Sequence, residues 1–231
     1  MRKSNLFLGI ASLLATLLLI VYGIAALSPI NPKPAPSVDT SRSLSPLKSP
    51  TVSFGNPTKG PKDAKVAIFV FGDYQCQPCA DFEATVAQAA ADFPKDVRIV
   101  WKDMPNAAQH PESVGAANAA RCAADQGAFW QYHDALMQNQ ASLGAKNYVP
   151  FAAQLGLDLQ AFQSCIDNQA NKALVQRDYD EGQLLRVDST PYIFVNDRRI
   201  AGAISYEQLR GFIEAAIAEK SAPQPAGQPQ K

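Results

Sequence analysis

Two cysteines separated by two residues, Cys76 and Cys79, have the type and spacing that point most directly to chemistry. Such a pair can close a short disulfide and exchange it with other thiols through a mixed disulfide. The preceding run from Val66 to Phe71 is β-branched and aromatic, which predicts a buried strand. From Cys79 onward the apolar residues recur at helical spacing, so we expect Cys76 where a strand passes into a helix N-terminus.

This position predicts a reactive thiolate at Cys76. The first amides of a helix lack intrahelical partners, and together with the helix dipole they favour a negative charge. Cysteines of Cys-x-x-Cys motifs at such places have pKa values of about 3.5–7.5. Pro78 fits because the first helical turn needs no N–H donor. We therefore expect Cys76 to exchange with substrate sulfur and Cys79 to resolve the mixed disulfide.

Two other uses of the cysteine pair, a zinc site and a structural bridge, are weaker. Zinc needs about four ligands, commonly in two close pairs. The other candidate ligands form no second close pair; they are Cys122, Cys165, His110 and His133. A structural bridge across so short a loop removes little unfolded-state entropy. We predict no metal and no cofactor, and we expect His133 to be a partly buried packing residue and His110 to cap or start a helix.

The composition places the chain among proteins with a medium-sized globular domain. Its 231 residues are 47% apolar and its formal net charge is zero. The apolar fraction is enough for a sizeable core, and the zero net charge gives no sign of a nucleic-acid partner.

The N-terminal part predicts export to the far side of a membrane. Residues 1–5 are basic, and residues 6–27 form an uncharged run of 22, long enough to cross a bilayer. We expect a cytoplasmic N-terminus, a single-pass anchor at 6–27 and the domain outside; a cleaved signal peptide is the alternative. Residues 28–53, rich in Pro and Ser, should form an extended linker, and 221–231 a disordered tail.

We assign the folded domain to residues 54–220 and its class to α/β. A strand at 97–101 follows the motif helix, which gives a βαβ unit. Residues of about 111–186 read as helical, with Asp158 as an N-cap. The pattern then predicts three closing elements: strands at 192–195 and 199–202 around an Asn196-Asp197 turn, and a helix at 205–219 capped by Ser205.

Cys122 and Cys165 both fall in the helical region. In an exported domain the simplest expectation is that they pair, which would add roughly 4 kcal/mol of stability by the chain-entropy model. A second redox pair and two free buried thiols are the alternatives.

Taken together, this order of elements resembles the thioredoxin superfamily, and the helical insert resembles its DsbA-like branch of thiol:disulfide oxidoreductases. The stretches that carry the resemblance are FGDYQCQPC, AARCAADQGAFWQYHDAL and STPYIFVN. The resemblance implies a thioredoxin-like fold with a helical insertion between its βαβ and ββα halves.

The resemblance also implies roles for single residues. Cys76 would be the exposed nucleophile and Cys79 the buried resolving thiol. Pro191 would be a cis-proline against the dithiol, with Thr190 offering its backbone to a substrate peptide. Cys122 with Cys165 resembles the structural disulfide of some members.

The implied function is oxidation of cysteine-containing exported proteins, on the periplasmic side of a bacterial inner membrane, with a membrane partner recycling the dithiol. Two departures bear on this reading. Between the cysteines, proline comes second, after Gln77, as in thioredoxin, whereas many DsbA-like members have proline first. Val70 stands where some members have a buried acid on the strand before the motif, and Asp73 is a candidate proton carrier in its place. A reductase or isomerase, and a peptide-binding adaptor, are therefore the alternatives.

Overall fold

A computed structural model describes residues 47–222 of the chain. The expectations for residues 1–46, which include the anchor and most of the linker, lie outside the described residues, as do those for 223–231. Within residues 47–222, no helix is both long enough and apolar enough to cross a membrane.

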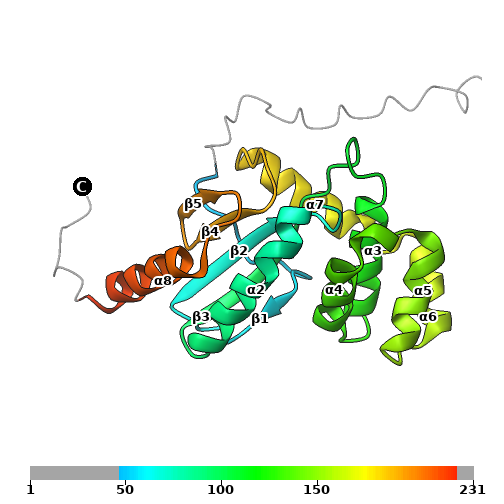
Figure 1. Ribbon diagram of the computed structural model, residues 1–231, viewed down its shortest axis with the longest axis horizontal. Coiled ribbons are helices and arrows are strands. Elements are labelled where there is room, and N and C mark those ends of the chain that lie inside the picture. The colour runs from blue at the N-terminus through cyan, green and yellow to red at the C-terminus, as the bar shows by residue number, and fades with distance from the viewer. Residues whose placement is uncertain (1–46, 223–231) are drawn as a thin grey trace, which may run out of the picture. The chain divides into compact units, whose positions relative to one another are not determined.

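A five-stranded mixed sheet forms the centre of the domain (Figure 1). Its strands, in chain order, are β1 (Thr58–Lys59), β2 (Val66–Gly72), β3 (Val97–Asp103), β4 (Tyr192–Val195) and β5 (Arg198–Ala201). They lie in the order β1-β3-β2-β4-β5, with β2 and β3 parallel and the other pairs antiparallel. The sequence predicted every strand except the short β1, which lies in a segment that reads as turns.

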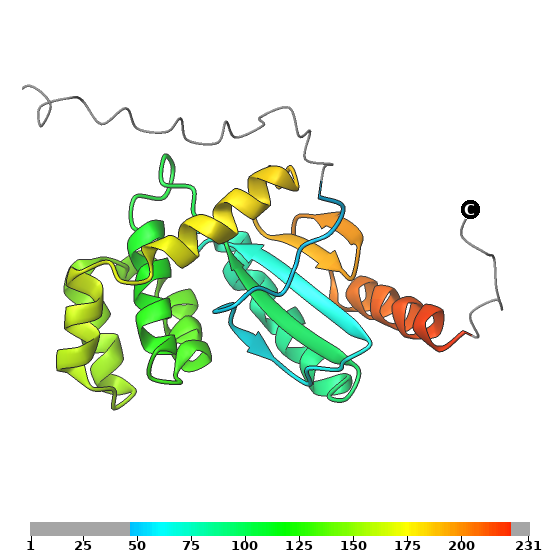
Figure 2. The ribbon, with the colours of Figure 1, turned by 180° about the vertical axis from the view of Figure 1, so that it is seen from behind.

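The two faces of β2 pack against different helices. Ile68 and Val70 share one apolar core with helices α2 (Gln77–Asp92) and α8 (Tyr206–Ser221). Phe69 and Phe71 belong to a second apolar cluster on the opposite face, the face on which α7 (Lys172–Leu184) lies. Figure 2, which views the molecule from behind, shows α7 on the side of the sheet away from α2. Burial on both faces explains why β2 reads as a continuous apolar run.

A group of helices between β3 and β4 lies beside the β1 edge of the sheet (Figures 1 and 2). Before α7 it contains α3 (Ser113–Ala124), α4 (Phe129–Gln138), the 3-10 turn η1 (Gln140–Ser142), α5 (Ala145–Gln154) and α6 (Leu159–Asp167). The sequence pattern predicted one continuous helix from Pro111 to Gln140, whereas the structure has two, α3 and α4. The break occurs because Gly127 adopts a positive φ of 74°, which ends α3 in a turn.

Helix caps and the hairpin turn follow local sequence rules. Asp158 accepts hydrogen bonds from the amides of Gln160 and Ala161 at the start of α6, which confirms the predicted cap. Ser205 and Gln208 form a reciprocal capping box at the start of α8. Asn196 takes a positive φ of 56° between β4 and β5.

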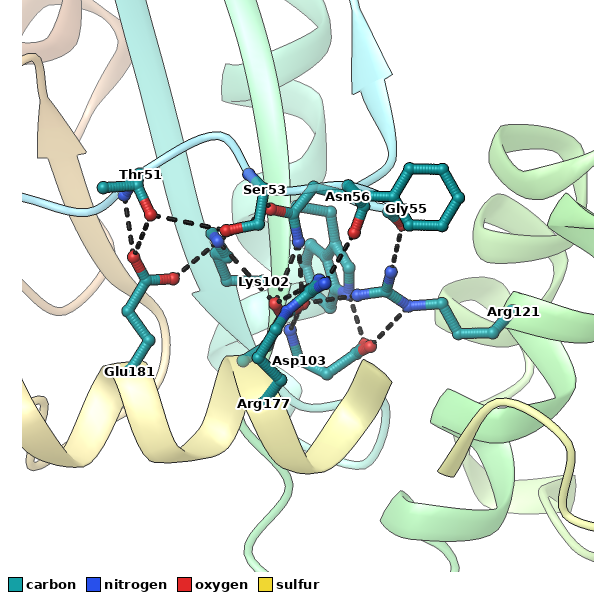
Figure 3. Close-up of polar contacts among 12 residues, drawn as sticks. Thr51, Ser53, Gly55, Asn56, Lys102, Asp103, Arg121, Arg177 and Glu181 are labelled. Atoms are coloured by element: carbon teal, nitrogen blue, oxygen red, sulfur yellow. Dashed lines mark hydrogen bonds and ion pairs between the residues drawn. The ribbon is translucent and has the colours of Figure 1, made fainter. Parts of the chain in front are cut away.

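A buried charge network, drawn in Figure 3, joins β3 to α3 and α7. Arg121 of α3 donates to the carboxylates of Asp103, at 2.8 Å, and Asp178. Lys102 of β3, also fully buried, donates to Glu181 of α7 at 2.6 Å. Buried charges are tolerated when they are paired and hydrogen-bonded as here.

The same network holds the chain that precedes β1. Asn56 accepts from Lys102 at 2.8 Å and donates to Asp178 at 2.9 Å. The backbone N–H of Thr51 donates to Glu181 at 2.7 Å. The chain therefore contacts the domain before Phe54, where we expected folding to begin, since charged partners from β3 and α7 fix Thr51 and Asn56.

Candidate active site

Cys76 lies where β2 gives way to α2. It is the N-cap residue of α2, in extended conformation, and its Sγ accepts a hydrogen bond from the backbone N–H of Cys79 at 3.3 Å. Pro78 occupies the first turn, where no N–H donor is required. The helix terminus therefore points its free amides at the sulfur, as the sequence predicted.

The two sulfurs have opposite electrostatic environments. A hydrogen bond from the Cys79 thiol lowers the pKa of Cys76 to about 6, although burial acts in the opposite direction. Burial raises the pKa of Cys79, and its hydrogen bond to the Cys76 sulfur raises it further. At neutral pH the pair therefore holds one thiolate, at Cys76, and one thiol, at Cys79.

Cys76 is more buried than the resemblance implied. The residue is 4% exposed and Cys79 is 2% exposed, so the expectation of an exposed nucleophile was wrong. The carbonyl oxygen of Thr190 lies 3.3 Å from the Cys76 sulfur, and the Gln140 side chain donates to the Cys76 carbonyl at 3.0 Å. These neighbours from two distant segments cover the motif.

Thr190 and Pro191 come to the motif through the sheet. The peptide bond between them is cis. β4 begins at the next residue and pairs antiparallel with β2, with Tyr192 opposite Phe71. Because β2 leads to the motif and β4 follows the proline, the shared register places the Thr190 carbonyl beside the Cys76 sulfur; the Cys76 thiol can donate to this carbonyl only in its protonated form.

Asp73 organises the turn between β2 and Cys76. Its buried carboxylate accepts from the backbone N–H groups of Gln75 and Asn106, each at 2.7 Å. It also pairs with Nδ1 of His110 at 2.9 Å. The sequence singled out Asp73 but gave no sign of His110 as its partner, because the two are 37 residues apart. In place of the predicted cap, the half-buried His110 side chain contacts the Asp73 carboxylate, and Glu112 is the N-cap residue of α3.

A groove of about 760 Å³ opens beside Thr190. One wall is the segment after β3, which includes Asn106 and Ala108, and another is α7, which contributes Tyr179. Arg186 lies in the segment that leads to Thr190. Sequence reasoning missed this groove because its walls come from three separate segments.

Cys122 and Cys165 are joined in a disulfide that links α3 to α6. The sulfurs are 2.03 Å apart, and the two residues are 43 positions apart in the sequence. Of the three alternatives left by the sequence, the structure has the bridge.

His133 differs from its sequence-based description, because it is fully buried instead of partly buried. Its Nδ1 lies 3.0 Å from the hydroxyl of Tyr74, two residues before Cys76. It also contacts the rings of Trp101, Phe129 and Trp130. The aromatic enclosure fixes the ring at the boundary of α4 and the core.

A family model described as Thioredoxin matches residues 53–215, which covers the strands, the Cys-x-x-Cys helix, the insert and most of α8. The chain belongs to the thioredoxin family. Its helices α3–α7 are inserted between β3 and β4 of the sheet.

Among curated proteins, this thioredoxin-family chain is similar to two Na(+)/H(+) antiporters. It is 32% identical over 160 residues to NhaA 1 of Salinispora arenicola and 30% identical over 160 residues to NhaA 3 of Salinispora tropica. The alignments cover 69% of this chain and 24% of each antiporter. The chain thus spans about a quarter of the length of the curated relatives it matches.

Solved structures show the same fold. BdbD from Bacillus subtilis superposes with a TM-score of 0.67 at 24% identity, over 74% of this chain and 96% of BdbD. The thiol-disulfide exchange protein α-DsbA2 from Wolbachia pipientis superposes with a TM-score of 0.63 at 20% identity. The match covers 70% of this chain and 87% of α-DsbA2. A thioredoxin-like oxidoreductase from Silicibacter pomeroyi superposes with a TM-score of 0.61 at 25% identity. The match covers 74% of this chain and 95% of the oxidoreductase.

Proposed function

We propose that this protein forms disulfides in exported proteins by dithiol exchange through Cys76 and Cys79. The observation that carries the proposal is the Cys76 sulfur at the N-terminus of α2, with its pKa lowered to about 6. The backbone of Thr190 beside it supports pairing with an extended, cysteine-containing segment of a substrate.

The exchange runs through one mixed disulfide. A substrate thiolate attacks the Cys76 sulfur of the Cys76–Cys79 disulfide, and Cys79 leaves and takes up a proton. A second substrate thiolate attacks the substrate sulfur of the mixed disulfide, and Cys76 leaves as a thiolate. The substrate loses two electrons and the Cys76–Cys79 pair gains them. A low leaving-group pKa at Cys76 speeds the second step and stabilises the reduced pair.

The cellular setting is part of this proposal. Residues 6–27 would anchor the chain in the bacterial inner membrane, with the domain on the periplasmic side. A membrane redox partner would then take the two electrons and restore the disulfide. The Cys122–Cys165 disulfide supports this placement, because such bridges persist outside the reducing cytoplasm.

A second candidate is a reductase or isomerase that the membrane partner keeps reduced. Its support is the order of Gln77 and Pro78 and the pKa of Cys76. A value of about 6 lies nearer the value of about 7 in thioredoxin than the value of about 3.5 in DsbA.

Equilibration of Cys76–Cys79 with glutathione separates the two directions. An oxidase should have a potential well above about −200 mV, whereas a value near −270 mV, about that of thioredoxin, would contradict the proposal. Alkylation of thiols in intact cells should find the pair oxidised in the first case and reduced in the second.

Substitution of Cys76 tests whether the protein is an enzyme at all. Cys76→Ser should abolish oxidation of a reduced two-cysteine peptide. Cys79→Ser cannot form the Cys76–Cys79 disulfide and should also fail to oxidise the reduced peptide, but its Cys76 thiolate should attack the disulfide form of the peptide and accumulate the mixed disulfide, since no Cys79 thiol is present to resolve it. If the Cys76→Ser variant kept full function in cells, a peptide-binding adaptor would replace the proposal.

A further inference from the structure

Three potential metal ligands gather where α2 meets α4, away from the cysteine pair. They are Glu83 of α2 and His133 and Asp134 of α4. One ligand atom from each lies within 4.8 Å of the other two. Two carboxylate oxygens and one imidazole nitrogen form a donor set that zinc accepts.

The second observation comes from the buried imidazole of His133. Its Nε2 is buried and, among residues 47–222, has no hydrogen-bond partner. The nearest carboxylate oxygen, Oε1 of Glu83, lies 3.2 Å away but does not meet hydrogen-bond geometry. A fully buried polar nitrogen without a partner is costly, so this arrangement calls for a ligand.

The geometry that fails as a hydrogen bond suits two neighbouring ligands of one ion. With metal–ligand bonds of about 2.0–2.1 Å, ligand atoms of a tetrahedral site lie about 3.4 Å apart. The 3.2 Å between His133 and Glu83 is close to that separation. The Asp134 side chain is exposed, so it can rotate to bring its carboxylate oxygen from within 4.8 Å of the other two ligand atoms to the spacing of a metal site.

Tyr74 supplies the outer partner that a metal-binding histidine requires. Its hydroxyl lies 3.0 Å from Nδ1 of His133. When Nδ1–H donates to the hydroxyl oxygen, Nε2 carries the lone pair that a metal binds. The surrounding aromatic rings hold the imidazole in that orientation.

We propose that Glu83, His133 and Asp134 bind a divalent transition metal, and that Zn²⁺ fits the three ligands best. The imidazole disfavours Mg²⁺ and Ca²⁺, which prefer all-oxygen sites, and the absence of sulfur from the ligand set disfavours Cu(I). The bound ion would join α2, which begins at the reactive cysteines, to α4.

The test is titration of the full-length protein with Zn²⁺ after oxidation of Cys76 and Cys79 to the disulfide, because free thiols also bind zinc. We expect about one Zn²⁺ per chain and a higher unfolding temperature. Glu83→Gln and Asp134→Asn should each weaken binding at least tenfold, since even outer-partner losses cost about 10–100-fold. Glu214→Gln, the same change at a carboxylate paired with Arg210 on α8, is the matched control and should bind normally.

Two further measurements keep the result unambiguous. Thermal unfolding without Zn²⁺ should show that the Glu83→Gln and Asp134→Asn variants fold. The sequence has two histidines, so imidazole NMR should show His133 signals shifted by Zn²⁺ and His110 signals unchanged. Absence of binding to the oxidised protein, shifts at His110 instead of His133, or full binding by both folded variants would overturn the proposal.

Discussion

The sulfur of Cys76 lies 3.3 Å from the carbonyl oxygen of Thr190, although the two residues are 114 positions apart. The antiparallel pairing of β4 with β2 creates this contact, since each residue lies just beyond one of the paired strands. The sheet register therefore sets which backbone carbonyl lies beside the sulfur.

The lowered pKa of Cys76 makes the stability of the reduced protein depend on pH. Its pKa is lowered from 9.0 to about 6, so the unfolded state binds more protons between these values. Stability from this group should therefore rise with pH across that window and be lost as pH falls through about 6. Cys79, whose pKa is raised, stays a thiol throughout the window.

Thermal unfolding of the reduced protein from pH 5 to 8.5 checks this dependence. The difference in unfolding temperature from the Cys76→Ser variant should grow above about pH 6. A constant difference across the range would mean that the Cys76 thiolate is not stabilised. The ultraviolet absorbance of the thiolate gives the pKa independently.

Asp73→Asn should produce two effects of different origin. Weakening of the hydrogen bonds that Asp73 makes with His110 and with the backbone N–H groups of Gln75 and Asn106 should cost about 1–3 kcal/mol of stability. Because the Asp73 charge raises the pKa of Cys76, its removal should lower that pKa further.

Urea unfolding measures the first effect and thiolate absorbance the second. Asp63→Asn, at an exposed carboxylate in the loop before β2, controls for the loss of charge and should change neither quantity. A rise in the Cys76 pKa on Asp73→Asn would contradict the electrostatic argument.

Arg121→Met should destabilise the protein by about 3–5 kcal/mol, because it leaves the buried Asp103 without a cationic partner, whereas Asp178 keeps Lys102 and Arg177. Adding Asp103→Asn should recover part of the loss, since it removes the carboxylate charge that Arg121→Met leaves without a cation. Denaturant unfolding of the single and double variants checks this, and a double variant no more stable than Arg121→Met would count against charge burial as the cause.

Replacing Cys122 and Cys165 together with Ala should cost about 4 kcal/mol by the chain-entropy model, given their separation of 43 residues. The reduction potential of Cys76–Cys79 should stay unchanged if the bridge is structural. A shifted potential would instead favour a second redox pair, and glutathione equilibration of the double variant decides between them.

The sequence by itself determined the local features of this protein. Apolar runs, caps and the Cys-x-x-Cys spacing predicted β2, β4, the start of α2 and the capping residues Asp158 and Ser205, because these depend on neighbours within a few positions. They also placed Cys76 at a helix N-terminus, from which the direction of its pKa shift followed.

Only the tertiary structure decided which distant groups meet. It paired Asp73 with His110, buried Cys76 against Thr190, assembled the network around Lys102 and brought Glu83 beside His133. Each contact joins residues far apart in the chain, and their approach depends on strand register and helix packing. A single sequence carries no local signal for such contacts, which is why the exposure of Cys76 and the burial of His133 were predicted incorrectly.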